Sequence, residues 1–250
     1  MVLSMDKWVG KVAVVTGASS GIGAAIVEEL VEHGVKVIGL ARRVELVEEL
    51  ANKLSNQKGE LHALKVDISN TQEIVNVFKT IEEKFGAVHI LVNNAGILLK
   101  SSLLDGDVEK WRKTFDTNVL GACTATKEAI SIMRKHDVDG YVINMNSTLG
   151  HKIPPISFNV YPASKFAITA LTETLKFELG TLNKKIRVTS ISPGLVETEI
   201  FKTENFTLPG MSEMPIMVPR DIADTVIFVL STPQHVQVEE LIVNPTGTMM

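Results

Sequence analysis

The chain has 250 residues, 45% of them hydrophobic, so it is long enough for one large α/β domain with a substantial core. Its net charge is −4 with acidic and basic residues interspersed, which excludes the basic stripe that nucleic-acid binding needs. The single cysteine, Cys123, excludes an intrachain disulfide, and no 18 apolar residues run together as a membrane span would require. We expect one cytoplasmic domain over residues 1–250, with Cys123 as a small buried thiol.

Short apolar runs rich in β-branched residues alternate with amphipathic helical segments along the chain. The predicted strands are residues 12–15, 36–40, 61–66, 89–92, 141–145, 187–191 and 240–243. The predicted helices lie near residues 21–33, 43–55, 70–85, 107–136, 158–181 and 220–231. Such alternation is typical of parallel strands with crossover helices on both faces, because each strand must then be buried on both sides. This predicts a doubly wound, three-layer α/β/α sandwich around a seven-stranded parallel sheet.

Residues 197–219 break this alternation. The segment contains three Met, two Phe and three Pro and has no clean hydrophobic period. A long irregular segment inside a compact domain is usually functional or mobile. We interpret it as a substrate-binding loop region.

The first predicted strand runs directly into a glycine-rich loop, Thr16-Gly17-Ala18-Ser19-Ser20-Gly21-Ile22-Gly23, which opens a helix. Glycines at these spacings permit a tight turn and let a phosphate approach backbone N–H groups at the helix N-terminus. The order of strand, loop and helix is the context that a dinucleotide-binding motif requires. We expect the cofactor phosphates to lie against Gly17, Ser19, Ser20, Gly21, Ile22 and Gly23.

The second predicted strand ends in Ala41-Arg42-Arg43, without a carboxylate. An acidic side chain here would accept hydrogen bonds from a free ribose hydroxyl, whereas a guanidinium group pairs with a 2′-phosphate. The strand end therefore favours NADP(H), and Arg42 carries more weight because Arg43 could be only a solvated helix residue.

Tyr161 precedes Lys165 by four residues and follows Ser147 by fourteen. On a helix, the i,i+4 spacing places the phenol and the ammonium on one face. A cation beside a tyrosine lowers its pKa from about 10, which favours proton transfer at an alcohol or carbonyl oxygen. Taken alone this spacing is common, so the interpretation depends on the other motifs.

Together with Asn93-Asn94-Ala95-Gly96, these motifs resemble the short-chain dehydrogenase/reductase family over nearly the whole chain. The resemblance implies a Rossmann-type domain with strand order 3-2-1-4-5-6-7 and a catalytic tetrad of Asn118, Ser147, Tyr161 and Lys165. Tyr161 would be the general acid or base, and Lys165 would lower its pKa and bind the nicotinamide ribose. Ser147 would hydrogen-bond the substrate oxygen, and the backbone of Asn118 would hold a water in the proton relay.

The resemblance also implies further cofactor contacts. Asp67 and Ile68 would meet the adenine, and Asn93, Asn94 and Gly96 would support the central strands beside the cofactor. The nicotinamide carboxamide would be bound by Pro193, Gly194, Val196 and Thr198. Six histidines lack metal-ligand spacing, so no metal site is expected.

Two segments should border the reacting carbon, residues 148–160 and the irregular stretch after Thr198. Their apolar content, including Ile200, Phe201, Met214, Ile216 and Met217, suits a lipophilic substrate, although the same side chains could pack on the domain or on another subunit. The start of the chain, the Gly39–Arg43 strand end and residues 158–179 resemble the branch of the family that holds insect farnesol dehydrogenases and vertebrate dehydrogenase/reductase member 11.

We therefore expect an NADP(H)-dependent oxidoreductase that interconverts an alcohol and its ketone or aldehyde on an isoprenoid such as farnesol, a steroid or another apolar carbonyl. Two alternatives stay open: a reductase of a carrier-bound acyl chain, which would need a basic docking patch, and a non-catalytic NADP(H)-sensing protein. The family resemblance implies a homodimer or homotetramer built through the helices at 107–136 and 158–181.

Overall fold

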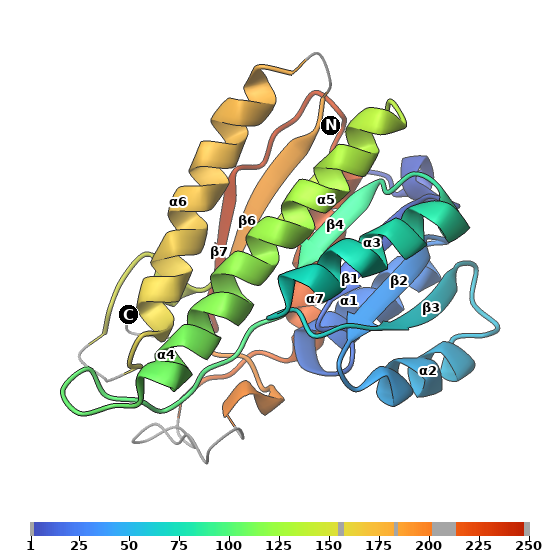
Figure 1. Ribbon diagram of the computed structural model, residues 1–250. Coiled ribbons are helices and arrows are strands. Elements are labelled where there is room, and N and C mark those ends of the chain that lie inside the picture. The colour runs from blue at the N-terminus through green and yellow to red at the C-terminus, as the bar shows by residue number, and fades with distance from the viewer. Residues whose placement is uncertain (1–2, 155–157, 183–184, 202–213, 248–250) are drawn as a thin grey trace.

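A computed structural model describes residues 3–154, 158–182, 185–201 and 214–247. Within these ranges, seven strands form one parallel sheet in the order β3-β2-β1-β4-β5-β6-β7, which confirms the expected architecture and strand order (Figure 1). The strands are β1 (Val12–Thr16), β2 (Lys36–Ala41), β3 (Glu60–Lys65), β4 (Ile90–Asn93), β5 (Tyr141–Met145), β6 (Arg187–Pro193) and β7 (Glu240–Val243).

Helices cover both faces of the sheet. In Figure 1, α3, α5 and α6 lie in front of the sheet, with α1 and α7 behind it. The front helices are α3 (Thr71–Phe85), α5 (Gly121–Lys135) and α6 (Tyr161–Gly180), and α4 (Val108–Phe115) leads into α5. The other face carries α1 (Gly21–Glu32), α2 (Val44–Lys53) and α7 (Pro219–Ser231). No helix in the described ranges is long and apolar enough to cross a membrane.

Each central strand contributes to two hydrophobic cores, one on each face. All five residues of β1 are buried. Ala13 and Val15 pack into the core beneath α1, α2 and α7, whereas Val12 and Val14 pack into the core beneath α3 and α5. Side chains alternate between the two faces of a strand, so an unbroken apolar run is what a strand buried on both sides requires.

The expected helix over residues 107–136 is interrupted. Its first part, α4, is followed by a five-residue π-helical turn, Asp116–Leu120, before α5 begins at Gly121. The backbone approaches closely there: a Cβ on Gly121 would collide with the carbonyl oxygen of Ile68. Cys123, expected to be buried, is only half-buried on α5.

The helix expected from residue 158 begins instead at Tyr161. Asn159 adopts a left-handed backbone with φ 57°, which stops a helix from starting earlier. Pro162 lies in the first turn, where its missing N–H costs no hydrogen bond. Tyr161 is therefore the first residue of α6, and Lys165 lies one turn later.

All seven strands run in parallel, so their carboxyl ends meet at one edge of the sheet. The glycine-rich loop leaves β1 there, and the chain emerges from β4, β5 and β6 beside it. Two short 3-10 turns border the same edge, η3 (Thr148–Gly150) after β5 and η4 (Glu199–Phe201) after β6.

Candidate active site

A cleft of about 620 Å³ opens at the carboxyl edge of the sheet, between the β1–α1 loop and the start of α6. We call it the glycine-loop cleft. The expected site residues that line it come from motifs along the whole chain: Gly17, Ser19, Ser20, Gly21, Ile22, Arg42, Arg43, Asp67, Ile68, Asn94, Gly96, Tyr161, Lys165, Pro193 and Thr198. The fold thus brings the glycine-rich loop and the Tyr161–Lys165 pair into one cavity.

The glycine-rich loop follows a path that larger residues could not take. Gly17 has φ +69°, and a Cβ on it would lie 2.9 Å from the Cα atom of Ala95. Gly21 has φ +57° and opens α1, whose N-cap residue Ser20 makes no side-chain capping bond. Backbone N–H groups at such a helix start suit a phosphate, so the loop fits the diphosphate of a dinucleotide.

Two asparagines after β4 fix the strands around the loop. Asn94 donates from Nδ2 to the carbonyl oxygen of Thr16 at 2.9 Å, and its own N–H donates to Thr16 Oγ1 at 3.0 Å. Asn93 lies behind the cleft, where its Nδ2 donates to Asn144 Oδ1 at 2.9 Å. These contacts lock β1, β4 and β5 in register directly beneath the loop.

Both arginines after β2 line the glycine-loop cleft, together with Asp67. Arg43 donates from Nη2 to Ser20 Oγ at 2.9 Å and pairs with Glu199 at 2.8 Å, so it is more than a solvated helix residue. Burial acts to raise the pKa of Asp67, but hydrogen bonds from Ser69 and the positive charge of Arg42 outweigh burial and lower it. The carboxylate of Asp67 is thereby kept ionised beside the cleft.

At the opposite end of the cleft, Tyr161 and Lys165 approach Ser147 at the end of β5. Lys165 Nζ donates to the carbonyl oxygen of Met145 at 2.8 Å and lies 5.6 Å from the centroid of the Tyr161 ring. Ser147 Oγ accepts the N–H of Leu149 at 3.1 Å and so caps the turn η3. Tyr161, Lys165 and Ser147 are all buried.

Burial controls the protonation of this cluster. It raises the pKa of Tyr161 well above its usual value, and a hydrogen bond with Ser147 opposes that shift only in part. It lowers the pKa of Lys165 to about 8. The expected lowering of the Tyr161 pKa by Lys165 is therefore not observed, because desolvation dominates and the ammonium is directed to the carbonyl of Met145. The buried phenol keeps its proton at neutral pH.

Asn118 lies in the π-helical turn and holds two neighbouring segments together. Its Oδ1 accepts the N–H of Ile97 at 2.8 Å, and its Nδ2 donates to the carbonyl oxygen of Ile97 and to Ser164 Oγ on α6. The side chain thus ties the chain after β4 to α6 at the residue directly before Lys165. A π-helical turn is often found at functional sites because it alters the backbone hydrogen-bonding pattern.

An apolar cluster surrounds Tyr161. Its buried members come from α6 and from the connections after β4, β5 and β6, and partly buried side chains of η4 pack against them: Leu98, Leu149, Phe158, Tyr161, Leu195, Ile200 and Phe201. Met217, expected to face the substrate, is instead buried in the core beneath α7. Residues 155–157 and 202–213, parts of the expected substrate-binding segments, lie outside the described residues.

Some expected cofactor residues lie outside the cleft wall: Gly23, Asn93, Gly194 and Val196. Gly23 packs against the carbonyl oxygen of Gly17, and Gly194 faces the side chain of Asn244. The wall also contains residues that the motifs did not predict: Leu40, Ala41, Val66, Ala95, Ile97, Thr117, Met145, Asn146, Glu199 and Ile200. Most of these, including Glu199 after Thr198, adjoin a motif residue, which could have indicated them.

The sequence profile of the short chain dehydrogenase family matches residues 11–208. The chain belongs to the short-chain dehydrogenase/reductase family. Members of this family use NAD(P)(H), so the glycine-loop cleft fits the family's cofactor class, and the protein is an oxidoreductase. Within the ranges that the structure describes, no group of three or more His, Cys, Asp or Glu side chains could hold a metal ion.

Relatives within the family match nearly the whole chain. Farnesol dehydrogenase of Aedes aegypti is 49% identical over 97% of this chain and 99% of its own length. Dehydrogenase/reductase SDR family member 11 of Bos taurus is 41% identical over 97% of this chain and 98% of its own. Among solved structures, an alcohol dehydrogenase from the archaeon Thermococcus sibiricus, complexed with 5-hydroxy-NADP, superposes with a TM-score of 0.85 at 28% identity, covering 96% of this chain and 98% of that one.

Proposed function

We propose that this protein is an NADP(H)-dependent oxidoreductase that interconverts an alcohol and its ketone or aldehyde on a lipophilic small molecule. The observation that carries the proposal is the position of Tyr161. Its phenol lies in the glycine-loop cleft together with the glycine-rich loop, and Ser147 and Lys165 lie beside it. A proton donor at one end of a dinucleotide site is the arrangement that carbonyl reduction requires.

The bound cofactor would supply hydride to the carbonyl carbon. Tyr161 would give its phenolic proton to the carbonyl oxygen, and Ser147 would donate a hydrogen bond to that oxygen as negative charge develops on it. Because burial keeps the phenol protonated, its proton is available in the reductive direction. Lys165 would stabilise the phenolate left behind, and Asn118 would hold the chain after β4 against α6.

Two arginines support the choice of the phosphorylated cofactor. Arg42 and Arg43 line the cleft beyond the end of β2, where Ala41 leaves no carboxylate to repel a 2′-phosphate. The solved relative with bound 5-hydroxy-NADP agrees with this choice. The roles proposed for Arg42 and Arg43 are those of phosphate ligands.

The apolar cluster around Tyr161 supports a lipophilic substrate. Leu98, Leu149 and Leu195 pack there with Phe158, and none of these side chains could pair with a carboxylate or phosphate. Farnesol, the substrate that names the mosquito relative, is an isoprenoid alcohol of this apolar kind. We propose an isoprenoid such as farnesol and its aldehyde first, with steroids or other apolar carbonyls next.

The proposal includes a single domain, a cytoplasmic location and a homodimer or homotetramer. Cys123 is a free thiol, which suits a reducing compartment. Exposed apolar side chains on α6, among them Phe166, Leu171 and Phe177, suit contact with a second copy.

A screen of cofactor consumption tests the proposal. Isoprenoid, steroid and aromatic carbonyls are offered with NADPH, with NADH in parallel, and the corresponding alcohols with NADP⁺. We expect turnover of apolar carbonyls with NADPH as the preferred donor. Equal or better rates with NADH would overturn the cofactor assignment, and the absence of turnover in either direction would overturn the activity.

A further inference from the structure

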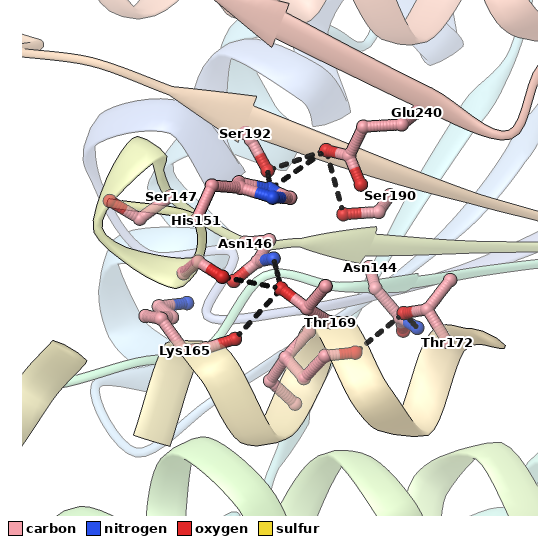
Figure 2. Close-up of polar contacts among 12 residues, drawn as sticks. Asn144, Asn146, Ser147, His151, Lys165, Thr169, Thr172, Ser190, Ser192 and Glu240 are labelled. Carbon is pink, nitrogen blue, oxygen red and sulfur yellow. Dashed lines mark hydrogen bonds and ion pairs between the residues drawn. The ribbon is translucent and has the colours of Figure 1, made fainter. Parts of the chain in front are cut away.

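Four polar side chains from three elements form a network beside the Ser147 turn (Figure 2). His151 follows η3, Ser190 and Ser192 belong to β6, and Glu240 belongs to β7. His151 Nε2 lies 2.9 Å from Ser192 Oγ and 3.4 Å from Glu240 Oε1. The same Oε1 accepts hydrogen bonds from Ser192 at 2.6 Å and from Ser190 at 3.1 Å. These contacts join η3 to the last two strands of the sheet.

The donors and acceptors of this network define the tautomer of His151. An ionised carboxylate only accepts hydrogen bonds, so Ser192 directs its one hydroxyl proton to Glu240. Ser192 can then only accept from the imidazole, and His151 Nε2 must carry a proton. Ser190 and Ser192 are at most 1% exposed, so their hydroxyls need these partners. Removing the imidazole would leave an acceptor position of Ser192 unsatisfied.

The network holds one side of the turn that carries Ser147. His151 is only four residues beyond Ser147, and the N–H of Gly150 donates to the carbonyl oxygen of Ser147 at 2.9 Å. On the other side, Thr169 of α6 donates from Oγ1 to the carbonyl oxygen of Gly150 at 2.9 Å. The turn is therefore held from α6 by Thr169 and from β6 and β7 by His151. In Figure 2 the His151 ring points to the strands, away from Thr169.

We propose that His151 is a positioning residue that fixes Ser147 relative to the end of β6. Its partner Ser192 directly precedes Pro193, which lines the glycine-loop cleft at the segment expected to hold the nicotinamide. The N–H of Asn146 already donates to the carbonyl oxygen of Ile191 at 2.8 Å, and the His151–Ser192 hydrogen bond adds a second link beyond it, between the turn that carries Ser147 and the segment expected to hold the hydride donor. The inference rests on the proposed function, because it assigns His151 a role in that same reaction.

Small displacements in such a site have large effects on rate. A misplacement of about 1 Å can cost on the order of 100-fold in catalysis, because the reacting atoms must stay aligned. His151 itself lies outside the cleft wall, so cofactor binding does not depend on it directly. Its loss should reduce kcat and leave the dissociation constant for NADPH nearly unchanged.

The test compares His151→Leu with His151→Gln, which keeps an N–H donor, and with His136→Leu. His136 is a matched control, because its Nε2 pairs with Glu82 at 2.8 Å and it has similar exposure, 34% against 25% for His151. We expect His151→Leu to lower kcat by about tenfold or more and to raise the primary isotope effect with [4-²H]NADPH. His151→Gln should recover most of kcat, and His136→Leu should stay within twofold of the wild type.

A measurement on the protein without cofactor separates a positioning role of His151 from a role in the chemical step. Amide hydrogen exchange at Gly150 and His151 should accelerate in His151→Leu and be largely restored in His151→Gln. If His151→Leu does not fold, Ser192→Ala removes the same link with a smaller change and should show the same loss of kcat. A kcat within twofold of the wild type in His151→Leu or Ser192→Ala, or equal losses in His151→Leu and His151→Gln, would overturn the proposal. A wild-type protein without turnover would instead overturn the proposed function, and the exchange data alone would then decide whether His151 holds the turn.

Discussion

Arg43 and Glu199 form an ion pair across the mouth of the glycine-loop cleft, with Nη2 2.8 Å from Oε2. The two residues are 156 positions apart in the sequence. The same Nη2 donates to Ser20 Oγ in the glycine-rich loop, so one guanidinium joins the loop, the start of α2 and the turn η4. A cofactor phosphate that binds Arg43 must therefore compete with the carboxylate of Glu199.

Replacing Glu199 with Gln should strengthen NADPH binding. The partners are 49% and 52% exposed, and such pairs contribute about 0.2–1 kcal/mol, so the dissociation constant should fall by no more than about fivefold. NADH affinity should change less. Fluorescence titration measures both dissociation constants. Glu109→Gln is the control, because it breaks an ion pair with Arg112 on the surface of α4. Weaker NADPH binding would show that Glu199 holds the cofactor.

Replacing Arg42 with Ala should weaken NADPH binding by about 10- to 100-fold, because a charge-assisted hydrogen bond contributes about 1.5–3 kcal/mol. NADH lacks the 2′-phosphate, so its affinity should stay within about twofold. The ratio of kcat/KM for the two cofactors measures the effect. Arg112→Ala, which removes an exposed guanidinium on α4, is the matched control. If both cofactors lost affinity equally, Arg42 would be no phosphate ligand.

Replacing Tyr161 with Phe removes the phenolic proton and keeps the ring. Turnover should fall by at least about 100-fold, the contribution typical of a positioned general acid, whereas NADPH should still bind. Steady-state rates and fluorescence titration separate the two effects. Tyr141→Phe is a control, because its hydroxyl bonds Thr189 within the core, away from the cleft. An unchanged rate in Tyr161→Phe would refute the proposed mechanism.

Lys165 makes stability depend on pH in a predictable direction. Burial lowers its pKa from 10.5 to about 8, so below about pH 8 the folded protein carries the full cost of burying the charged ammonium. Between pH 8 and 10.5 the folded chain binds fewer protons than the unfolded chain, so this residue adds stability as pH rises. Lys165→Met should therefore melt several degrees above the wild type at pH 7, and the difference should shrink by pH 10. A pH-independent difference in Tm would contradict the assigned pKa.

Replacing Leu171 with Glu should dissociate the proposed oligomer. Leu171 lines a groove of about 780 Å³ between α5 and α6, together with Cys123 and Ile130. A buried carboxylate at a subunit contact is strongly unfavourable, so the mass from light scattering should fall to that of one chain. Leu104→Glu, at a position that is 97% exposed, should leave the mass unchanged. A wild-type protein that is already monomeric would refute the assembly.

The sheet could be predicted from the sequence because its strands carry their own signal. Every residue of β1 and β5 is buried, and apart from Thr16 and Asn144 these strands consist of apolar or aromatic residues, a pattern that few other elements match. The expected strand bounds differ from the observed ones by at most two residues, at the end of β6. Most of the motif residues lie at strand ends or helix starts, so a correct strand order was enough to bring most of them into one cleft.

Other features depend on tertiary contacts, which a local sequence pattern does not reveal. The pairing of Arg43 with Glu199 and that of His151 with Glu240 require the connections after β5 and β6 to be placed in space. The spacing of Tyr161 and Lys165 correctly predicted their adjacency. It gave no measure of burial, and desolvation is what raises the pKa of Tyr161.

The π-helical turn Asp116–Leu120 has a consequence for the length of the chain. Such a turn contains about one residue more than an α-helical turn, and each residue of a helix advances it by about 100°. Ala125, Ala129 and Met133 pack into the core beneath α3 and α5. A π-helical turn holds its extra residue as a local bulge, so the helix that follows it keeps its phase. Deleting one residue within α5 would instead rotate the rest of that helix by about 100° and carry these side chains toward solvent. A change of one residue in length is therefore tolerated better in the turn than within α5.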